Sequence, residues 1–168
     1  PERGLVGSAP EIREAKPVVE PKDIARARAV LDAAGKSPVI EEEFDPSLPP
    51  VLANADALVQ VLINLIANAA EACAGMTEPR IAVRTRFASG LQLHRTAAGE
   101  PVRLPIELRV SDNGPGVDPA MANHLFEPFV TTKKSGQGLG LALVRRMVRD
   151  MNGRISYVNH AFCTMTGW

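Results

Sequence analysis

Apolar residues recur every three or four positions in several stretches of the chain, as one buried face of a helix requires. After Asp23, for example, Ile24, Ala27 and Leu31 follow this spacing, and Gly35 is placed to end the helix. The same pattern predicts helices over 22–34, from Asn54 or Asp56 to Cys73, in a short segment that starts at Asp118-Pro119, and over 138–151 before Gly153.

Other stretches alternate between apolar and polar residues, which predicts half-buried strands. Residues 81–87 place arginines on their polar face, and residues 102–111 place Glu107 and Arg109 there. Opposite charges on neighbouring strands attract, so we expect these two strands to pair antiparallel through a long hairpin over 89–101. With a further strand at 39–44, the pattern predicts an α+β fold, an open sheet with helices on one face.

Composition and charge narrow the class of protein. A chain of 168 residues with 45% hydrophobic content is long enough for one core. Nineteen basic and nineteen acidic residues balance, so no nucleic acid or membrane contact is expected. The longest uncharged stretch, 57–70, is too short to span a bilayer, and Cys73 and Cys163 lack the spacing of metal ligands. A cytoplasmic domain fits these features best.

The two ends of the chain differ from its middle. Residues 1–21 are rich in proline, glycine and charge, which is typical of a linker or of the end of a preceding module. The chain starts at Pro1 without a methionine, so we expect it to be a fragment of a longer protein. The main domain is predicted over 22–153, and residues 154–168 form a tail.

Two glycine-bearing loops give the clearest chemical signal. Asp112 is followed by Gly114 and Gly116, and a carboxylate beside closely approachable backbone suits the exocyclic amine of adenine. Gly136, Gly138 and Gly140 precede an apolar-periodic run, so their amides are expected at a helix N-terminus, where phosphate is favoured. Either loop alone is also typical of a tight turn without a ligand. Together they predict an ATP site.

A polar stripe on the second predicted helix adds a metal candidate. Asn64 and Asn68 are four residues apart and share one face. An amide oxygen is a hard, neutral ligand that suits Mg²⁺ already held by triphosphate oxygens. The alternative is a solvated helix face.

The segment 126–133 lies between the two glycine loops. Lys133 is a candidate for neutralising phosphate charge. Phe126 and Phe129 are either ordinary core residues or part of a hinge or docking surface.

Four motifs in this order resemble the ATP-binding catalytic domain of sensor histidine kinases, within the gyrase, Hsp90, histidine kinase and MutL ATPase superfamily. The resemblance covers about residues 22–153. It rests on an N box at 64–72, a G1 box at 112–116, an F box at 126–133 and a G2 box at 136–141. The segment Phe126–Lys133 and the Leu-Gly-Leu-Ala-Leu-Val run are most similar to NtrB-type nitrogen-regulation sensor kinases.

The resemblance implies a Bergerat fold, a two-layer sandwich in which helices cover one face of a mixed, largely antiparallel sheet. It implies ATP and Mg²⁺ under a lid around residues 130–138. Asn68 would be the Mg²⁺ ligand, Asp112 would bind the adenine amine, and Asn64 and Lys133 would be the catalytic residues near the phosphates. The full set implied to bind the cofactor is Asn64, Asn68, Asp112, Gly114, Gly116, Thr131, Thr132, Lys133, Gly136, Gly138, Leu139 and Gly140.

The implied function is transfer of the γ-phosphoryl group of Mg-ATP to a histidine on a separate dimerisation module, in nitrogen regulation. The implied partners are that module, an NtrC-like response regulator and a PII-type regulatory protein. The clamp ATPases of the superfamily have a water-activating glutamate where this chain has Asn64, which argues against hydrolysis. A clamp ATPase and a nucleotide-sensing module without catalysis remain the alternatives.

Two features depart from the family pattern. Its phosphoacceptor histidine is followed by glutamate in a helical hairpin, and His94, His124 and His160 have no such context. The tail 154–168 resembles the opening of a PAS domain instead of the usual closing strands. We therefore expect either an unpaired sheet edge or a substitute strand near Ile155–Val158.

Overall fold

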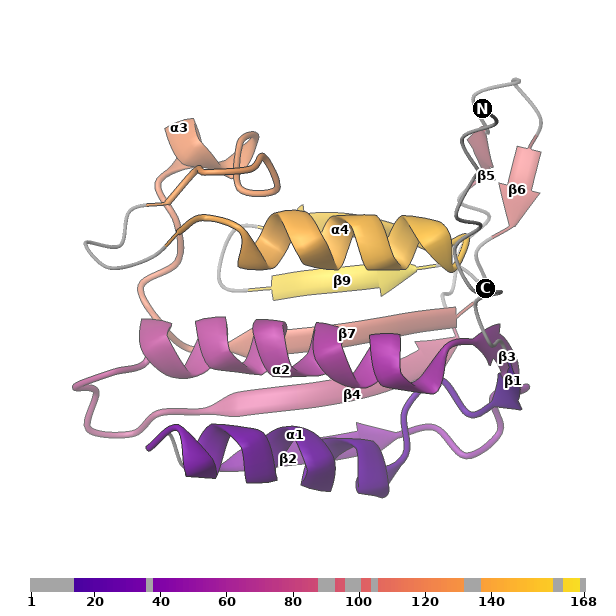
Figure 1. The fold of residues 1–168 in the computed structure, drawn as a ribbon, viewed down its shortest axis with the longest axis horizontal. Helices are drawn as coiled ribbons and strands as arrows, with labels where there is room; N and C mark the ends of the chain where they lie inside the picture. The colour runs from indigo at the N-terminus through magenta and orange to yellow at the C-terminus, as the bar shows by residue number, and fades with distance from the viewer. Residues whose placement is uncertain are drawn as a thin grey trace, which may run out of the picture.

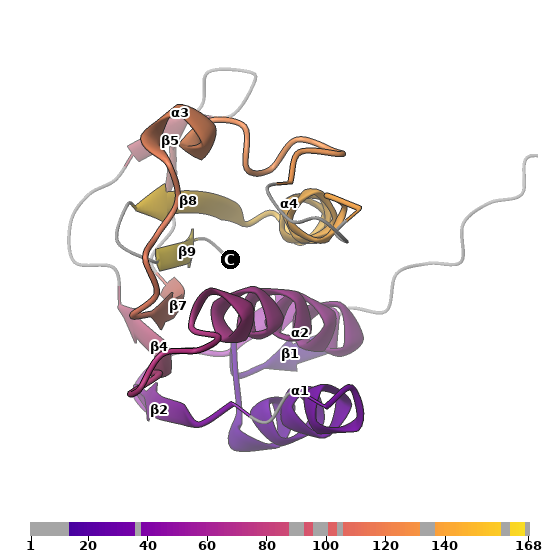
Figure 2. The same ribbon diagram turned by 90° about the vertical axis from the view of Figure 1, so that its left-hand side faces the viewer.

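The structure is a computed structural model that describes residues 14–35, 38–87, 93–95, 101–103, 106–131, 137–158 and 162–166. Helices α1, α2 and α4 cover one face of a five-stranded sheet with the strand order β2-β4-β7-β9-β8 (Figures 1 and 2). Strands β2 and β4 are parallel and the other neighbours are antiparallel. The predicted α+β sandwich of a mixed sheet and helices is confirmed. The elements are β1 (Glu14–Lys16), α1 (Pro21–Ala33), β2 (Ile40–Phe44), β3 (Val51–Ala53), α2 (Ala55–Ala72), β4 (Ile81–Phe87), β5 (Leu93–Arg95), β6 (Pro101–Arg103), β7 (Ile106–Asp112), α3 (Pro119–Ala122), α4 (Gly140–Asp150), β8 (Arg154–Val158) and β9 (Phe162–Thr166).

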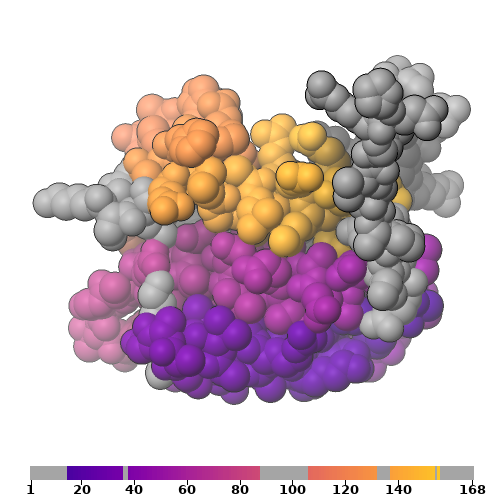
Figure 3. Space-filling view, in the orientation of Figure 1, coloured from indigo at the N-terminus to yellow at the C-terminus, as the bar shows by residue number. Residues whose placement is uncertain are grey.

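The central helix α2 packs between α1 and α4 and against the sheet (Figure 3). It begins after Asn54, whose side chain accepts a hydrogen bond from Ala57 N at 2.8 Å. By length and composition its 18 residues also suit a membrane span. Its face with Leu58, Leu62 and Ile66 is fully buried in the fold, however, as in the core helix of a globular domain.

Strands β4 and β7 place charged residues on the sheet face opposite the helices. Arg86 donates to Glu107 at 2.8 and 3.2 Å, which confirms the predicted cross-strand pairing. The register also sets Arg84 directly opposite Arg109. Each of these arginines has a carboxylate partner elsewhere, because Arg84 bonds Glu43 at 2.8 Å and Arg109 lies 3.1 Å from Glu107. Each of the two facing arginines therefore has a carboxylate within reach, and Arg109 shares Glu107 with Arg86.

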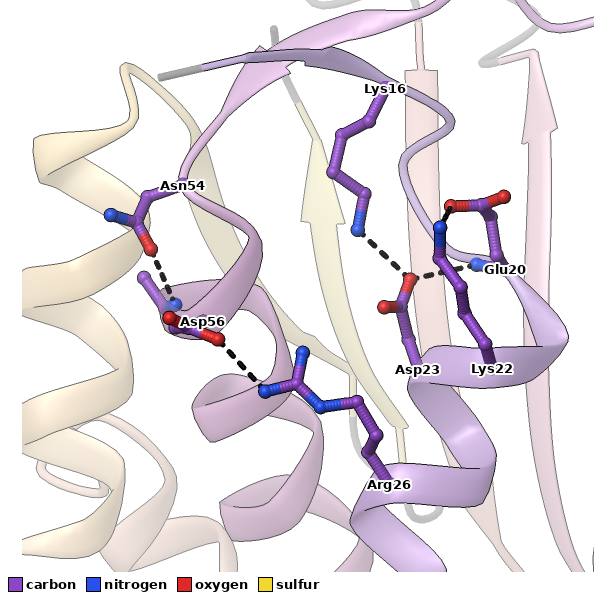
Figure 4. Close-up of polar contacts among 8 residues, drawn as sticks. Lys16, Glu20, Lys22, Asp23, Arg26, Asn54 and Asp56 are labelled. Atoms are coloured by element: carbon purple, nitrogen blue, oxygen red, sulfur yellow. Dashed lines mark hydrogen bonds and ion pairs between the residues drawn. The ribbon is translucent and has the colours of Figure 1, made fainter. Parts of the chain in front are cut away.

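The folded unit begins before residue 22, in the segment expected to be a linker. β1 pairs antiparallel with β3, and Val18 and Val19 are buried. Next to them the Lys16 ammonium contacts the Asp23 carboxylate at 2.9 Å, and both side chains are almost fully buried (Figure 4). Asp23 also accepts from Glu20 N at 3.0 Å. This buried pair ties the first strand to the N-terminus of α1.

The tail completes the sheet. β9 pairs with β7, and β8 pairs with β9 as the edge strand. Of the two expected alternatives, an unpaired edge or a substitute strand near Ile155–Val158, the structure confirms the second. Ile155 is half-buried and packs on the core. Residues 154–158 and 162–166 thus belong to the same sheet as the rest of the domain.

Helix α4 ends in a left-handed residue, as many helices do. That residue is Asn152, with φ of 62°, and not the predicted Gly153. Gly153 N donates to Val148 O at 2.8 Å and Asn152 N donates to Arg149 O at 2.9 Å. These two bonds form a Schellman motif, which turns the chain directly from α4 into β8.

Candidate functional site

One face of α2 brings the predicted motifs together. Asn64, Asn68 and Ala72 succeed one another at four-residue intervals, so they lie in a row along the helix. The row is about 12 Å long, from the 1.5 Å rise per residue. All three residues are half-buried. Their positions in the row decide which loop each of them meets.

The Asp112 loop meets the Ala72 end of this row. Gly114 N donates to Asp112 Oδ1 at 2.9 Å, which folds the carboxylate back over the loop. A Cβ on Gly114 would stand 2.8 Å from that oxygen and 2.9 Å from the Ala72 methyl group, so a side chain does not fit there. Gly116 has φ of 77°, a left-handed conformation that glycine adopts without strain. The sequence pattern gave no sign that Ala72 is the residue facing Gly114.

The start of α4 meets the Asn64 end of the row. A Cβ on Gly140 would stand 3.0 Å from Asn64 Oδ1, and the Asn64 Nδ2 group donates to Gln60 O at 2.9 Å. The N-cap of α4 is Leu139, which offers no side-chain acceptor to the first-turn amides. Those amides are therefore suited to an anionic ligand. In Figure 1 the ends of α2 and β7 and the start of α4 lie toward the same side of the molecule.

Gly138 holds the approach to α4 against the F box. Its φ is 66°, and a Cβ there would stand 2.6 Å from the Phe129 carbonyl carbon. Phe129 N donates to Gly138 O at 3.0 Å, and Phe129 itself has φ of 66°. Phe129 is 77% exposed, so it is not a core residue, whereas Phe126 is half-buried. The bond between Phe129 and Gly138 joins the F box directly to the residues that precede α4.

Several predicted site residues fall outside this description. Thr132, Lys133 and Gly136 lie outside the described residues, so their predicted roles stay predictions. Thr131 is described and exposed. The described part of the site therefore contains the N box, the G1 box, residues 126–131 of the F box and residues 137–141 of the G2 box.

Burial changes the acidity of the candidate adenine acceptor. Partial burial raises the pKa of the Asp112 carboxyl above its ordinary value, and the bond from Gly114 N opposes this rise. The charged form is thus held in a partly dehydrated position. A hydrogen-bond donor that enters the site therefore stabilises the Asp112 carboxylate.

A hollow of about 380 Å³ lies at the end of α2 but on its other face. Its lining includes Ala70, Cys73 and Ala74. Because successive residues of a helix are rotated by about 100°, these positions lie on the face away from the row of Asn64, Asn68 and Ala72. The remaining walls come from the segments before β2 and before β4. None of the predicted site residues that the structure describes lines this hollow.

Comparison with known proteins identifies the family. Residues 53–166 match the model of the histidine kinase-, DNA gyrase B- and HSP90-like ATPases. The chain belongs to this family. The match extends through β9, so the tail that resembled a PAS domain lies within the family's own fold.

Curated relatives are similar over the same region. The chain is 50% identical to the sensory histidine kinase/phosphatase NtrB of Rhizobium meliloti (strain 1021) over 114 residues, which is 68% of this chain and 30% of that protein. It is 44% identical to the NtrB of Rhodobacter capsulatus over 135 residues, or 76% of this chain and 37% of that protein. The chain therefore spans about a third of the length of these relatives.

Solved structures share the fold. Full-length ShkA, crystallised in complex with AMPPNP, is 24% identical with a TM-score of 0.63, over 95% of this chain and 32% of that chain. The mycobacterial sensor histidine kinase MprB is 23% identical with a TM-score of 0.60, over 92% and 95%. The arrangement of sheet and helices described above is that of histidine kinase domains.

Proposed function

We propose that this chain is the ATP-binding catalytic domain of an NtrB-type sensor histidine kinase. It binds Mg-ATP in the cytoplasm and delivers the γ-phosphoryl group to a histidine on a separate dimerisation module. The observation that supports this best is the row on α2, with the Asp112 loop at one end and the uncapped start of α4 at the other. The NtrB relatives support the nitrogen-regulation assignment, with an NtrC-like response regulator as the next acceptor and a PII-type protein as regulator.

The described residues fit a nucleotide. The partly dehydrated Asp112 carboxylate, in a loop where glycine lets the backbone pack closely against Ala72, suits an adenine amine. The first-turn amides of α4 suit phosphate oxygens. Asn68, between these two ends, supplies an amide oxygen to Mg²⁺ held by the phosphates. Gly116 shapes the adenine end and Gly138 faces the phosphates. For Lys133, which lies outside the described residues, the role proposed from the sequence is neutralisation of phosphate charge.

An amide at Asn64 favours transfer over hydrolysis. A water-activating base would need an ionisable group within reach of the phosphates, and Asn64 has none. Its amide is also already engaged with Gln60 O. A kinase gains from this because water competes with the acceptor for the phosphoryl group. The amide at Asn64, in place of an ionisable side chain, also distinguishes the proposed kinase from a clamp ATPase.

Mixing this chain with a histidine-containing helical hairpin of an NtrB relative and labelled ATP tests the proposal. We expect acid-labile label on the hairpin and none on this chain alone, because in-line transfer needs a positioned acceptor. Binding of ATP without any label on the hairpin would favour a nucleotide-sensing module instead. Label on this chain in isolation, lost when His94, His124 or His160 is replaced, would place the acceptor here.

Replacing Asp112 by alanine is expected to weaken ATP binding about 10- to 100-fold, the equivalent of about 1.5–3 kcal/mol for a hydrogen bond to a charged group. The fold should survive, because Asp112 lies at the end of β7 and is half-buried. Calorimetric titration measures the affinity and thermal melting checks the fold. Unchanged ATP affinity in a folded variant would remove Asp112 from the site.

ATP affinity is also expected to fall with decreasing pH. The ionised Asp112 accepts from the amine and the protonated form does not, and the raised pKa means that protonation begins at a higher pH than for an ordinary aspartate. Titration of the nucleotide itself is subtracted by measuring Asp112→Asn in parallel. The wild-type affinity should drop more steeply than that of Asp112→Asn as the pH falls toward that raised pKa. Parallel curves would contradict an ionised acceptor at this position.

Asn68→Ala is expected to weaken ATP binding mainly when Mg²⁺ is present. A ligand of the metal has no effect on affinity once the metal is removed. Titrations in excess Mg²⁺ and in EDTA should therefore differ for this variant. An equal loss under both conditions would assign Asn68 a structural role in α2 instead.

A further inference from the structure

Asn113, the residue after Asp112, is bonded to three residues in two stretches of the chain, the end of α2 and the segment before β4. Asn113 Oδ1 accepts from Arg80 N at 2.8 Å and from the Cys73 thiol at 3.4 Å. Asn113 Nδ2 donates to Glu78 O at 2.8 Å, and Asn113 N donates to Arg80 O at 3.2 Å. The side chain uses both ends of its amide although the residue is exposed to solvent.

These bonds fix the loop relative to the end of α2. Cys73 is the C-cap of α2 and follows Ala72, the residue that faces Gly114. Residues 78–80 lead into β4, whose first residue, Ile81, pairs with Asp112. Asn113 therefore joins the helix end, the turn that follows it and the end of β7. The separation between Ala72 and the Asp112 loop is set at this junction.

We infer that Asn113 is a positioning residue, which holds the Asp112 carboxylate in place to accept the hydrogen bond from the adenine amine. Its side chain bonds Cys73, Glu78 and Arg80, so it acts through Asp112 and not by touching the nucleotide. This inference rests on the proposed function. It adds a determinant of adenine selectivity that lies outside the set of nucleotide-contacting residues.

If Asn113 positions Asp112, its loss should weaken the binding of ATP more than that of a nucleotide without the 6-amino group. Asn113→Ala removes three side-chain bonds, and we expect ATP affinity to fall about 5- to 30-fold, the range for one to two net hydrogen bonds. Purine riboside triphosphate has no 6-amino group for Asp112 to bind, so its affinity should change by less than about 2-fold. A merely structural defect in the domain would weaken both nucleotides alike.

A double-mutant cycle by calorimetry, on Asp112→Ala, Asn113→Ala and the double variant, tests the dependence directly. If Asn113 acts through Asp112, the double variant binds ATP no more weakly than Asp112→Ala. Glu78→Ala is the matched control, because it changes the same turn but leaves the Glu78 carbonyl that Asn113 bonds. It should bind ATP like the wild type.

Additive losses in the cycle, or equal losses for both nucleotides, would overturn the positioning role while leaving ATP binding at Asp112 intact. Wild-type protein that binds no ATP, or Asp112→Ala that binds normally, would overturn the proposed site and this inference with it. If Asn113→Ala melts below the assay temperature, Asn113→Ser replaces it in the cycle, since its hydroxyl still accepts from Arg80 N. For Asn113→Ser we then expect a smaller loss of ATP affinity, and again no further loss when it is combined with Asp112→Ala.

Discussion

Replacing Lys16 by methionine is expected to lower the free energy of unfolding by about 3–5 kcal/mol, the range for breaking a buried ion pair. The Lys16 and Asp23 side chains are 6% and 2% exposed and 2.9 Å apart, so the lost partner leaves a charge in a dry position. Asp23→Asn should have a comparable effect, because it strands the ammonium. Urea unfolding measures both variants.

The exposed pair between α1 and α2 provides a matched control. Arg26 and Asp56 are 2.8 Å apart, yet their side chains are 53% and 85% exposed. Arg26→Gln should therefore cost less than about 1 kcal/mol. The double variant Lys16→Met/Asp23→Asn should recover much of the loss, because no uncompensated charge remains and the asparagine oxygen can still accept from Glu20 N. A loss for Lys16→Met no larger than for Arg26→Gln would show that the pair contributes little to folding.

Deleting residues 154–168 is expected to abolish cooperative folding. The deletion removes β8 and β9, and with them the five residue pairs that join β9 to β7. Each backbone hydrogen bond contributes a net of roughly 0.5–1.5 kcal/mol, and the packing of Ile155 is lost as well. The sum approaches the about 5–15 kcal/mol that holds a typical domain folded.

A chain that ends at Thr166 is the control for this deletion, since it keeps both strands. Its thermal unfolding should match that of the full chain. The shorter chain should show either no transition or one at a much lower temperature. Identical melting curves for the two shortened chains would mean that β8 and β9 contribute nothing to stability.

The sequence predicted the long periodic elements well. Strand β4 has the predicted bounds 81–87, and α1 and α4 begin and end within two residues of the predictions. These elements have one strongly apolar face, which sets their period and register. The strands β1 and β3 were missed because three residues beside prolines are too short to show alternation.

The site was only partly visible in the sequence. Spacing along α2 predicts that Asn64 and Asn68 share a face, because helix geometry is local. The contacts of Ala72 with Gly114 and of Asn64 with Gly140 join segments far apart in the chain, and no local period encodes them. The order of the four motifs indicated the family, whereas the bonds of Asn113 to Cys73 and to residues 78–80 required the structure.

Hydrogen exchange with and without Mg-ATP tests the central claim most directly, because it reports where the nucleotide binds along the chain. We predict slower exchange at 64–72, at 112–116 and in the first turn of α4, and loss of this protection in Asp112→Ala. Residues 38–39 and 73–76 around the opposite hollow should change little. Protection confined to that hollow, with residues 64–72 and 112–116 unaffected, would contradict the assignment of the nucleotide site.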